Sequence, residues 1–356
     1  NLGGCMSAKI DLSKAHLSRV HGDIVAVFTW VNDERAMVLI PYVRKNAPWY
    51  IVMESAAFWE QPVTVRVPAT SANLGPGFDC LGLALGLYDE VTAQAISGQH
   101  RVEIVGVGAE TLASDASHLV LATALRTFEH LNVAPPVVGL HCVNAIPQAR
   151  GLGSSSAAIV AGVLLARALL VDGDDRLSDA QVMDLVVNME GHPDNAAPCL
   201  LGGFVVAWGP PNGAKRLPVH PDITPIVLVP DTQLLTETAR SLLPDEVPMA
   251  EAVSNISRAA LLVEALTRDP ALLMPATVDR LHQERRRPAM PQSLALLDDL
   301  RAAGIPAVVS GAGPSLLALC ATAEQVSATR AAGQSHAGWQ VLEPGFADAG
   351  AGVVAG

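Results

Sequence analysis

The chain has 356 residues, 50% of them hydrophobic and 16% charged, and its 23 Lys and Arg stand against 35 Asp and Glu for a net charge of −12. This composition predicts a compact globular protein with room for two domains, and it argues against disorder and against a basic surface for nucleic acid or anionic membrane. Five scattered cysteines suggest neither a disulfide framework nor a zinc site, and no membrane span or signal peptide is recognisable, so we expect a cytoplasmic protein.

The first 62 residues differ in composition from the rest and are predicted to form a separate small β unit. Aromatic and β-branched runs separated by polar turns predict a three-strand meander at residues 24–31, 36–43 and 49–53. Met6 resembles an initiator methionine behind a short expression leader. An interaction module or a regulatory extension is the alternative, and residues 1–62 are left out of the functional prediction.

From residue 63 onward, helices and strands alternate as in one continuous enzyme. Strands are predicted at residues 63–67, 81–88, 91–96, 102–107, 137–142, 203–207, 226–229, 307–310 and 315–320. Helices are predicted at residues 113–131, 154–170, 178–190, 254–267 and 291–303. Because regular βαβ units are missing, the pattern predicts an α+β fold with helices packed on mixed or antiparallel sheets.

A loop rich in Gly and Pro is predicted at residues 68–79, with the sequence PATSANLGPGFD. The prolines and glycines of this loop predict a tightly turning backbone that would bring the amide of Asn73 close to the carboxylate of Asp79. A surface turn is the plain alternative, since Asn and Asp cap turns wherever they occur.

A second loop, Gly151–Ser156, precedes the apolar helix predicted at 154–170 and has the sequence GLGSSS. Glycines allow close backbone approach, and the helix start directs free N–H groups at the loop, so the segment predicts a phosphate-binding site. An ordinary turn before a buried helix is the alternative. The dinucleotide fingerprint would need Gly at Ser156, and a Walker loop would need Lys before Ser or Thr; neither is present.

Polar groups gather at residues 190–195, EGHPDN, just past a predicted helix end. A core would not tolerate this density of polar groups unpaired, and Glu190 is a plausible ligand for a hard, oxygen-liganded cation. A further glycine loop at 310–315, SGAGPS, is weak evidence by itself because such turns are common.

In their order along the chain, the loops at 68–79, 147–158 and 310–315 resemble the three motifs of the GHMP kinases, over residues 63 to about 325. The resemblance implies a two-domain fold, with a ribosomal S5 domain 2-like N-terminal domain at 63–220 and a ferredoxin-like C-terminal domain at 221–356. The 68–79 loop and the EGHPDN segment resemble the homoserine kinases in particular. Two later segments, TETARSLLP at 236–244 and DRLHQERR at 279–286, agree with this subfamily.

The resemblance implies an ATP:L-homoserine O-phosphotransferase of threonine biosynthesis that uses ATP and Mg²⁺, with a homodimer as the expected assembly. The residues implied to bind L-homoserine are Asn73, Asp79, His192, Thr236, Arg240 and Arg286, with the two arginines on the carboxylate and Asp79 on the ammonium. The residues implied to hold ATP are Pro147, Arg150, Gly151, Leu152, Gly153, Ser154, Ser155, Ser156 and Ala157. Ser155 and Glu190 are the implied Mg²⁺ ligands, and Asn195 and Arg240 the residues implied to act catalytically.

No general base is assigned. Mevalonate kinase relatives carry an aspartate near the position of Asn195, and an amide cannot accept a proton. Phosphoryl transfer through a loose transition state needs little prior deprotonation. The charged Glu284-Arg285 pair leaves Arg285 or Arg287 as alternatives to Arg286 by a register slip. A GHMP kinase for another small alcohol and a non-catalytic binding relative are the alternative functions.

Overall fold

The structure is a computed structural model that describes residues 11–20, 24–31, 34–40 and 53–354. In the N-terminal part, β1 (Asp11–Val20), β2 (Ile24–Val31) and β3 (Glu34–Ile40) form an antiparallel sheet in that order. The strand predicted at 24–31 is confirmed and the one at 36–43 is found in part, whereas β1, rich in polar residues, was not predicted. Of the strand predicted at 49–53, residues 49–52 lie outside the described residues.

Residues 54–59 run along the helices of the following domain. Glu54 forms a β-bridge with Val133, and Phe58 forms one with Leu170 and packs edge-on against Phe128 with ring centroids 5.6 Å apart. This short segment is therefore part of the packing of the main body, although the prediction assigned it to the extra N-terminal unit.

One large sheet organises the first domain. Its strands are β4 (Val63–Ala72), β5 (Leu81–Ala95), β6 (Arg101–Gly106), β7 (Val138–Asn144), β8 (Phe204–Trp208), β9 (Gly213–Leu217) and β14 (Gly352–Val354). The order is β14-β4-β5-β7-β6, and β8 pairs with both β5 and β9. All pairs are antiparallel except β6 with β7.

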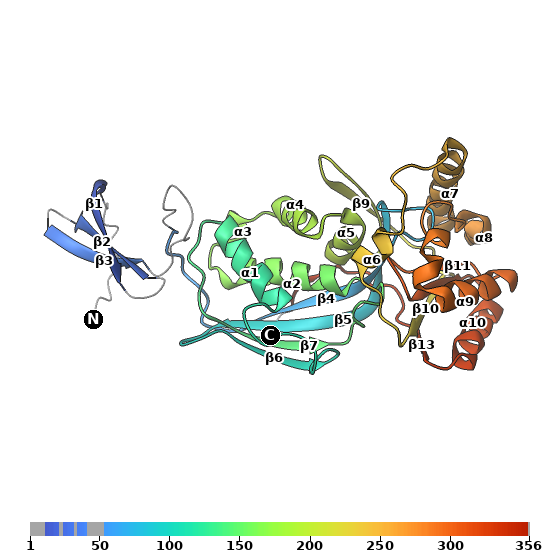
Figure 1. Cartoon of the computed structure of the whole chain (residues 1–356), viewed down its shortest axis with the longest axis horizontal. Helices are drawn as coiled ribbons and strands as arrows, with labels where there is room; N and C mark the ends of the chain where they lie inside the picture. The colour runs from blue at the N-terminus through green and yellow to red at the C-terminus, as the bar shows by residue number, and fades with distance from the viewer. Residues whose placement is uncertain (1–10, 21–23, 32–33, 41–52, 355–356) are drawn as a thin grey trace.

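Helices cover one face of this sheet, as Figure 1 shows. They are α1 (Leu119–His130), α2 (Ser154–Leu169), α3 (Gly173–Arg176), α4 (Asp179–Glu190) and α5 (Pro193–Leu201). Helix α2 is apolar on nearly all sides because it lies at the centre of the main hydrophobic core, between the sheet and the other helices. Its N-terminus is thereby held rigidly at the edge of the domain that faces the second sheet.

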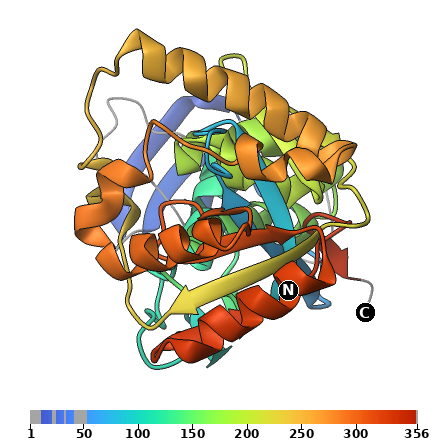
Figure 2. The same ribbon diagram turned by 90° about the vertical axis from the view of Figure 1, so that its right-hand side faces the viewer.

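The second domain contains an antiparallel sheet in the order β11-β12-β10-β13. Its strands are β10 (Thr224–Pro230), β11 (Ala307–Val309), β12 (Leu316–Cys320) and β13 (Trp339–Leu342). Its helices are α6 (Thr236–Arg240), α7 (Met249–Thr267), α8 (Leu273–Ala276), α9 (Pro291–Ala302) and α10 (Ala323–Ser335), with 3₁₀ turns at Pro270–Leu272 and Glu284–Ala289. Figure 2 views this end of the molecule, with the yellow strand β10 between the gold helix α7 and the red helix α10.

The α+β, two-domain prediction is confirmed, with differences in detail. The strands predicted at 81–88 and 91–96 are one strand, β5, because the carboxylate of Asp89 is not in a turn but accepts backbone N–H bonds from Ala145 and Ile146 at 2.7 and 2.9 Å. The last strand, β14, returns to the first sheet, so the predicted division at 220 separates the two sheets but not the end of the chain. No helix among the described residues is both long and apolar enough to cross a membrane.

Candidate active site

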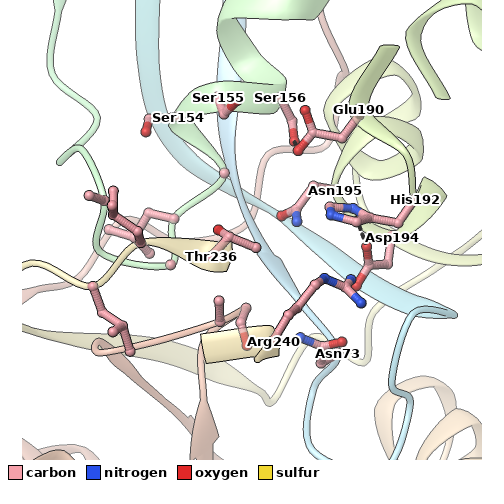
Figure 3. Close-up of a pocket in the computed structure, with 18 of the residues that line it drawn as sticks. Asn73, Ser154, Ser155, Ser156, Glu190, His192, Asp194, Asn195, Thr236 and Arg240 are labelled. Atoms are coloured by element: carbon pink, nitrogen blue, oxygen red, sulfur yellow. Dashed lines mark hydrogen bonds and ion pairs between the residues drawn. The ribbon is translucent and has the colours of Figure 1, made fainter. Parts of the chain in front are cut away.

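A cavity of about 300 Å³ lies where loops of both domains meet. Figure 3 shows its side chains: serines at the start of α2, polar groups at the start of α5, and Thr236 and Arg240 from α6 on the opposite side. Most of the predicted site residues line it, namely Asn73, Gly151, Leu152, Gly153, Ser154, Ser155, Ser156, Glu190, His192, Asn195, Thr236, Arg240 and Arg286. The fold therefore gathers residues spread over more than 200 positions of sequence into one site.

The glycine loop has the backbone geometry of an anion site. Gly151 and Gly153 both have positive φ, +73° and +69°, and a Cβ on Gly151 would lie 2.1 Å from the carbonyl oxygen of Ser310. Only glycine fits such a path. Among the described residues, no side chain caps the N-terminus of α2, so the N–H groups of Ser154 to Ser156 remain available to a ligand.

Glu190 and Ser156 form a close polar pair beside this helix start. Helix α4 ends at Glu190 because Gly191 adopts φ +91° as its C-terminal cap. Ser156 Oγ donates a hydrogen bond of 2.6 Å to Glu190 Oε1. Burial raises the pKa of the Glu190 carboxyl, and the hydrogen bond from Ser156 opposes that rise. The prediction paired Glu190 with Ser155, whose side chain is exposed and also lines a neighbouring cavity.

Helix α5 carries the EGHPDN groups into the site, with His192 as its N-cap residue and Pro193 at its first position. His192 Nδ1 lies 3.3 Å from Asp194 Oδ1, and this contact with a buried carboxylate raises the pKa of His192 against the effect of burial. Asn195 Oδ1 accepts a 2.7 Å hydrogen bond from Thr70 Oγ1. Asp194 and Thr70 lie within the EGHPDN segment and the 68–79 loop, but neither was predicted as a site residue.

Arg240, which lines the cavity, forms a two-pronged ion pair with Asp79, a predicted substrate residue that is not itself among the lining residues. Arg240 Nη2 lies 2.6 Å from Asp79 Oδ1, and Nη1 lies 3.2 Å from Oδ2. Asn73, with a left-handed φ of +66°, supports this arrangement: its Oδ1 accepts from the Asp79 N–H at 3.0 Å, and its Nδ2 donates to Gly311 O at 2.8 Å. The amide of Asn73 thus joins two of the motif loops.

Arg286 is the arginine of the 285–287 run that reaches the cavity. Its side chain is only 1% exposed, and Nη1 donates to His282 Nδ1 at 3.0 Å and to Gly311 O at 3.2 Å. Burial and the nearby cation of Arg240 lower the pKa of Arg286 to about 10. Arg285 instead pairs with Glu251 at 2.6 Å, and Arg287 pairs with Glu284 and Asp298, so of the three only Arg286 lines the cavity.

Three motif loops meet directly at the floor of the cavity. Ser310 Oγ lies 2.8 Å from Ser71 Oγ and 2.6 Å from the carbonyl oxygen of Gly151. The N–H of Gly311 donates to Ala72 O at 3.1 Å. The SGAGPS segment, a weak signal in the sequence, is therefore one of the links between the two domains.

Three of the predicted ATP residues lie away from this cavity. Arg150 donates to the carbonyl oxygens of Pro230 and Asp231 at 2.8 and 2.7 Å, so its guanidinium links the glycine loop to the second domain, and Pro147 is not a lining residue. Ala157 lines a second cavity of about 350 Å³, which shares Ser154 and Ser155 with the first. Its other walls come from β5 and from residues 111–120, which carry no recognisable motif.

Comparison with known proteins identifies the family of this fold. Residues 118–203 match the family model for the GHMP kinases N terminal domain, and residues 254–337 match that for the GHMP kinases C terminal. A homoserine kinase from Streptomyces avermitilis is 54% identical over 290 residues, covering 81% of this chain and 94% of that protein. A putative homoserine kinase from Listeria monocytogenes has a structure that superposes with a TM-score of 0.68 at 31% identity, over 83% of this chain and 99% of that one.

A homoserine kinase structure from Cytophaga hutchinsonii superposes with a TM-score of 0.72 at 26% identity, over 84% of this chain and all of that one. The fold and the site thus define a member of the GHMP kinase superfamily. Within that superfamily, the chain belongs to the homoserine kinases.

Proposed function

We propose that this protein transfers the γ-phosphoryl group of ATP to the hydroxyl of L-homoserine, giving O-phospho-L-homoserine and ADP. The observation that carries the proposal is the pairing of two kinds of subsite in one cavity: an uncapped helix start behind a glycine loop, and two guanidinium groups beside a carboxylate. The first suits phosphate and the second suits an amino acid.

The phosphates would lie against the N–H groups at the start of α2, with the adenosine in the adjoining second cavity. That cavity has more apolar than polar lining and joins the first through Ser154 and Ser155. A nucleotide would therefore cross the helix N-terminus between the two cavities. Since no lysine lies in the glycine loop, backbone donors and the helix dipole carry much of the phosphate binding.

The Ser156–Glu190 pair suits Mg²⁺, because both groups offer hard oxygen ligands 2.6 Å apart at the phosphate subsite. No cluster of three or more His, Cys, Asp or Glu occurs in the described residues, and an ion held by one or two protein oxygens and by phosphates requires none. Bound there, Mg²⁺ would offset the charge of the β- and γ-phosphates. Glu190 and Ser156 would thereby fix the phosphate chain in register with the acceptor.

L-Homoserine is a zwitterion, and the Arg240–Asp79 pair presents both complementary charges. Arg240 and the buried Arg286 favour a carboxylate between them, since the repulsion of two cations is relieved by an anion. Asp79 would take the ammonium, and Thr236, one helical turn before Arg240, would support the same subsite. The hydroxyl then extends towards Asn195 and the phosphate subsite.

Transfer would form a bond from the homoserine oxygen to the γ-phosphorus and break the bond to the β–γ bridging oxygen, releasing ADP. The hydroxyl proton leaves late, onto a phosphoryl oxygen, because the loose transition state requires little prior deprotonation. Arg240 and Asn195 would position the acceptor hydroxyl for attack on the γ-phosphorus. A cytoplasmic homodimer acting in threonine biosynthesis remains our prediction for its location, assembly and pathway.

A coupled assay of ADP release tests the proposal with L-homoserine, L-serine, L-threonine, mevalonate, galactose and shikimate as acceptors. We expect turnover with L-homoserine to exceed all others, because the clamped carboxylate and ammonium fix the reach of the hydroxyl to the phosphate. Comparable turnover of mevalonate, or ADP release with no acceptor preference, would contradict the assignment.

A further inference from the structure

Thr70 lies beneath the reacting end of the cavity and has no role in the proposed mechanism. It sits on β4, its side chain is fully buried, and its hydroxyl donates a 2.7 Å hydrogen bond to Asn195 Oδ1, 125 residues away. A carbonyl oxygen can only accept, so Thr70 must be the donor in this pair. The carbonyl oxygen of the Asn195 amide therefore already accepts one hydrogen bond from the protein.

The Asn195 side chain also borders the cavity. Asn195 is a lining residue, and Figure 3 shows its amide between the Ser156–Glu190 pair and Arg240. Oδ1 already accepts from Thr70, whereas Nδ2, which carries only donors, makes no hydrogen bond within the described residues, so both of its N–H groups are left for a ligand. A rotation of the amide by half a turn would change little in shape but would offer an acceptor instead.

We infer that Thr70 is a positioning residue, which holds the Asn195 amide at the reacting end of the cavity with its N–H groups towards the oxygens of phosphoryl transfer. The inference rests on the proposed function. A donor there can bind the acceptor oxygen of homoserine or an oxygen of the transferring group, both of which are electron-rich. It also directs the hydroxyl proton away from Asn195, in keeping with transfer that has no general base.

The phosphate loop encloses this pair. A Cβ on Gly153 would lie 1.9 Å from Thr70 Oγ1 and 3.1 Å from Asn195 Oδ1, and the Thr70 N–H donates to Leu152 O at 3.1 Å. Gly153 therefore covers the hydrogen bond closely. Buried in this way, the hydroxyl of Thr70 has the Asn195 oxygen as its partner instead of bulk water, and an unmade bond would be costly.

Two substitutions of Thr70 test the inference in the full chain. Thr70→Val keeps the shape of the side chain and removes the hydroxyl. We expect it to lower kcat by roughly three- to tenfold, which corresponds to the loss of about one neutral hydrogen bond, and to leave the KM values of homoserine and ATP nearly unchanged. Thr70→Ser keeps the hydroxyl and should restore most of kcat. Thr127→Val is the matched control, since Thr127 is equally buried but donates to Thr123 O inside α1; it should leave kcat unchanged.

The orientation of the amide can be tested without altering Thr70. Asn195→Asp offers only acceptors, so it should lower kcat more than Asn195→Ala, which offers nothing. In the Asn195→Ala background, Thr70→Val should cause no further loss, because a positioning residue acts through its partner. This coupling would not arise if Thr70 only stabilised the fold.

The outcomes separate this inference from the proposed function. A wild-type protein that does not phosphorylate homoserine would refute the proposed function itself. With an active wild type, four results would overturn only the inference about Thr70. Thr70→Val could keep full kcat, or Thr70→Ser could lose as much kcat as Thr70→Val. The loss from Thr70→Val could add to that from Asn195→Ala, or the kcat of Asn195→Asp could equal or exceed the kcat of Asn195→Ala.

Discussion

Arg240 holds the carboxylate of Asp79 through two hydrogen bonds of 2.6 and 3.2 Å, although the two residues lie 161 positions apart in the sequence. Both side chains remain about one-third exposed, so the pair is partly solvated rather than sealed in the core. We therefore expect it to offer a positive and a negative group to a zwitterionic ligand.

Removing the cation of this pair should weaken homoserine binding selectively. We expect Arg240→Ala to raise the KM of homoserine by about 10- to 100-fold and to leave the KM of ATP nearly unchanged. The effect is expected to be smaller than for a fully buried ion pair, because the guanidinium of Arg240 is partly solvated. Steady-state kinetics at saturating Mg²⁺-ATP measure both. Arg285→Ala is the control, because Arg285 pairs with Glu251 outside the cavity; an equal effect there would contradict the assignment of Arg240.

The Ser156–Glu190 hydrogen bond gives a second prediction. Glu190→Gln removes a charged oxygen ligand and should lower kcat by about 30-fold or more, in the range of a lost electrostatic contact to the transition state. Ser156→Ala should raise the Mg²⁺ concentration needed for half-maximal activity more than Ser155→Ala does. The reverse order for the two serines would restore the pairing of Glu190 with Ser155 that the sequence suggested.

His192 should make stability depend on pH. Because Asp194 raises its pKa in the folded state, protonated His192 contributes stability that is fully present below the unfolded value of about 6.5 and is lost as pH rises through the raised value. Urea unfolding of the wild type and of His192→Asn should therefore differ more at pH 6 than at pH 9. A difference that grew with pH would show that burial, not Asp194, controls the imidazole.

The packing of residues 54–59 predicts that two truncations behave differently. A chain that begins at Met53 keeps Phe58 against Phe128 and the Trp59 N–H bond to Leu169 O, and should match the full chain in stability and, within a few-fold, in activity. A chain that begins at Gln61 loses these contacts and should be less stable by about 1–3 kcal/mol. Equal melting temperatures would place the segment with the separate N-terminal unit.

Strong local patterns predicted the fold well, and weak ones did not. Helix α2 was predicted within one residue because Gly153 precedes a long apolar run. Helix α5 was not predicted, because its two prolines and several polar residues are typical of a loop. Pro193 is tolerated at the first position of the helix. Pro198 has no N–H for the carbonyl of Asp194, and it is accommodated by close packing against Gly82. Tertiary contacts decided that element.

The site was predictable where residue types share a motif, and not where partners are distant. The resemblance named Asn195 and Glu190, yet the identity of their partners, Thr70 and Ser156, depends on how β4 and α2 lie against α5 and α4. Arg150 shows the opposite case: it lies in the glycine loop, but its guanidinium binds carbonyl groups of the second domain. Position within a motif does not determine where a long side chain points.

The contact of Ser310 with Ser71 and Gly151 fastens the two domains together directly at the glycine loop. The domains therefore cannot part at that point without breaking buried hydrogen bonds. The opposite wall, at residues 231–248, is largely exposed and carries Thr236 and Arg240. We therefore expect any opening of the cavity to occur at this outer wall, so substitutions there would alter the rates of homoserine entry and product release even where they touch neither ligand.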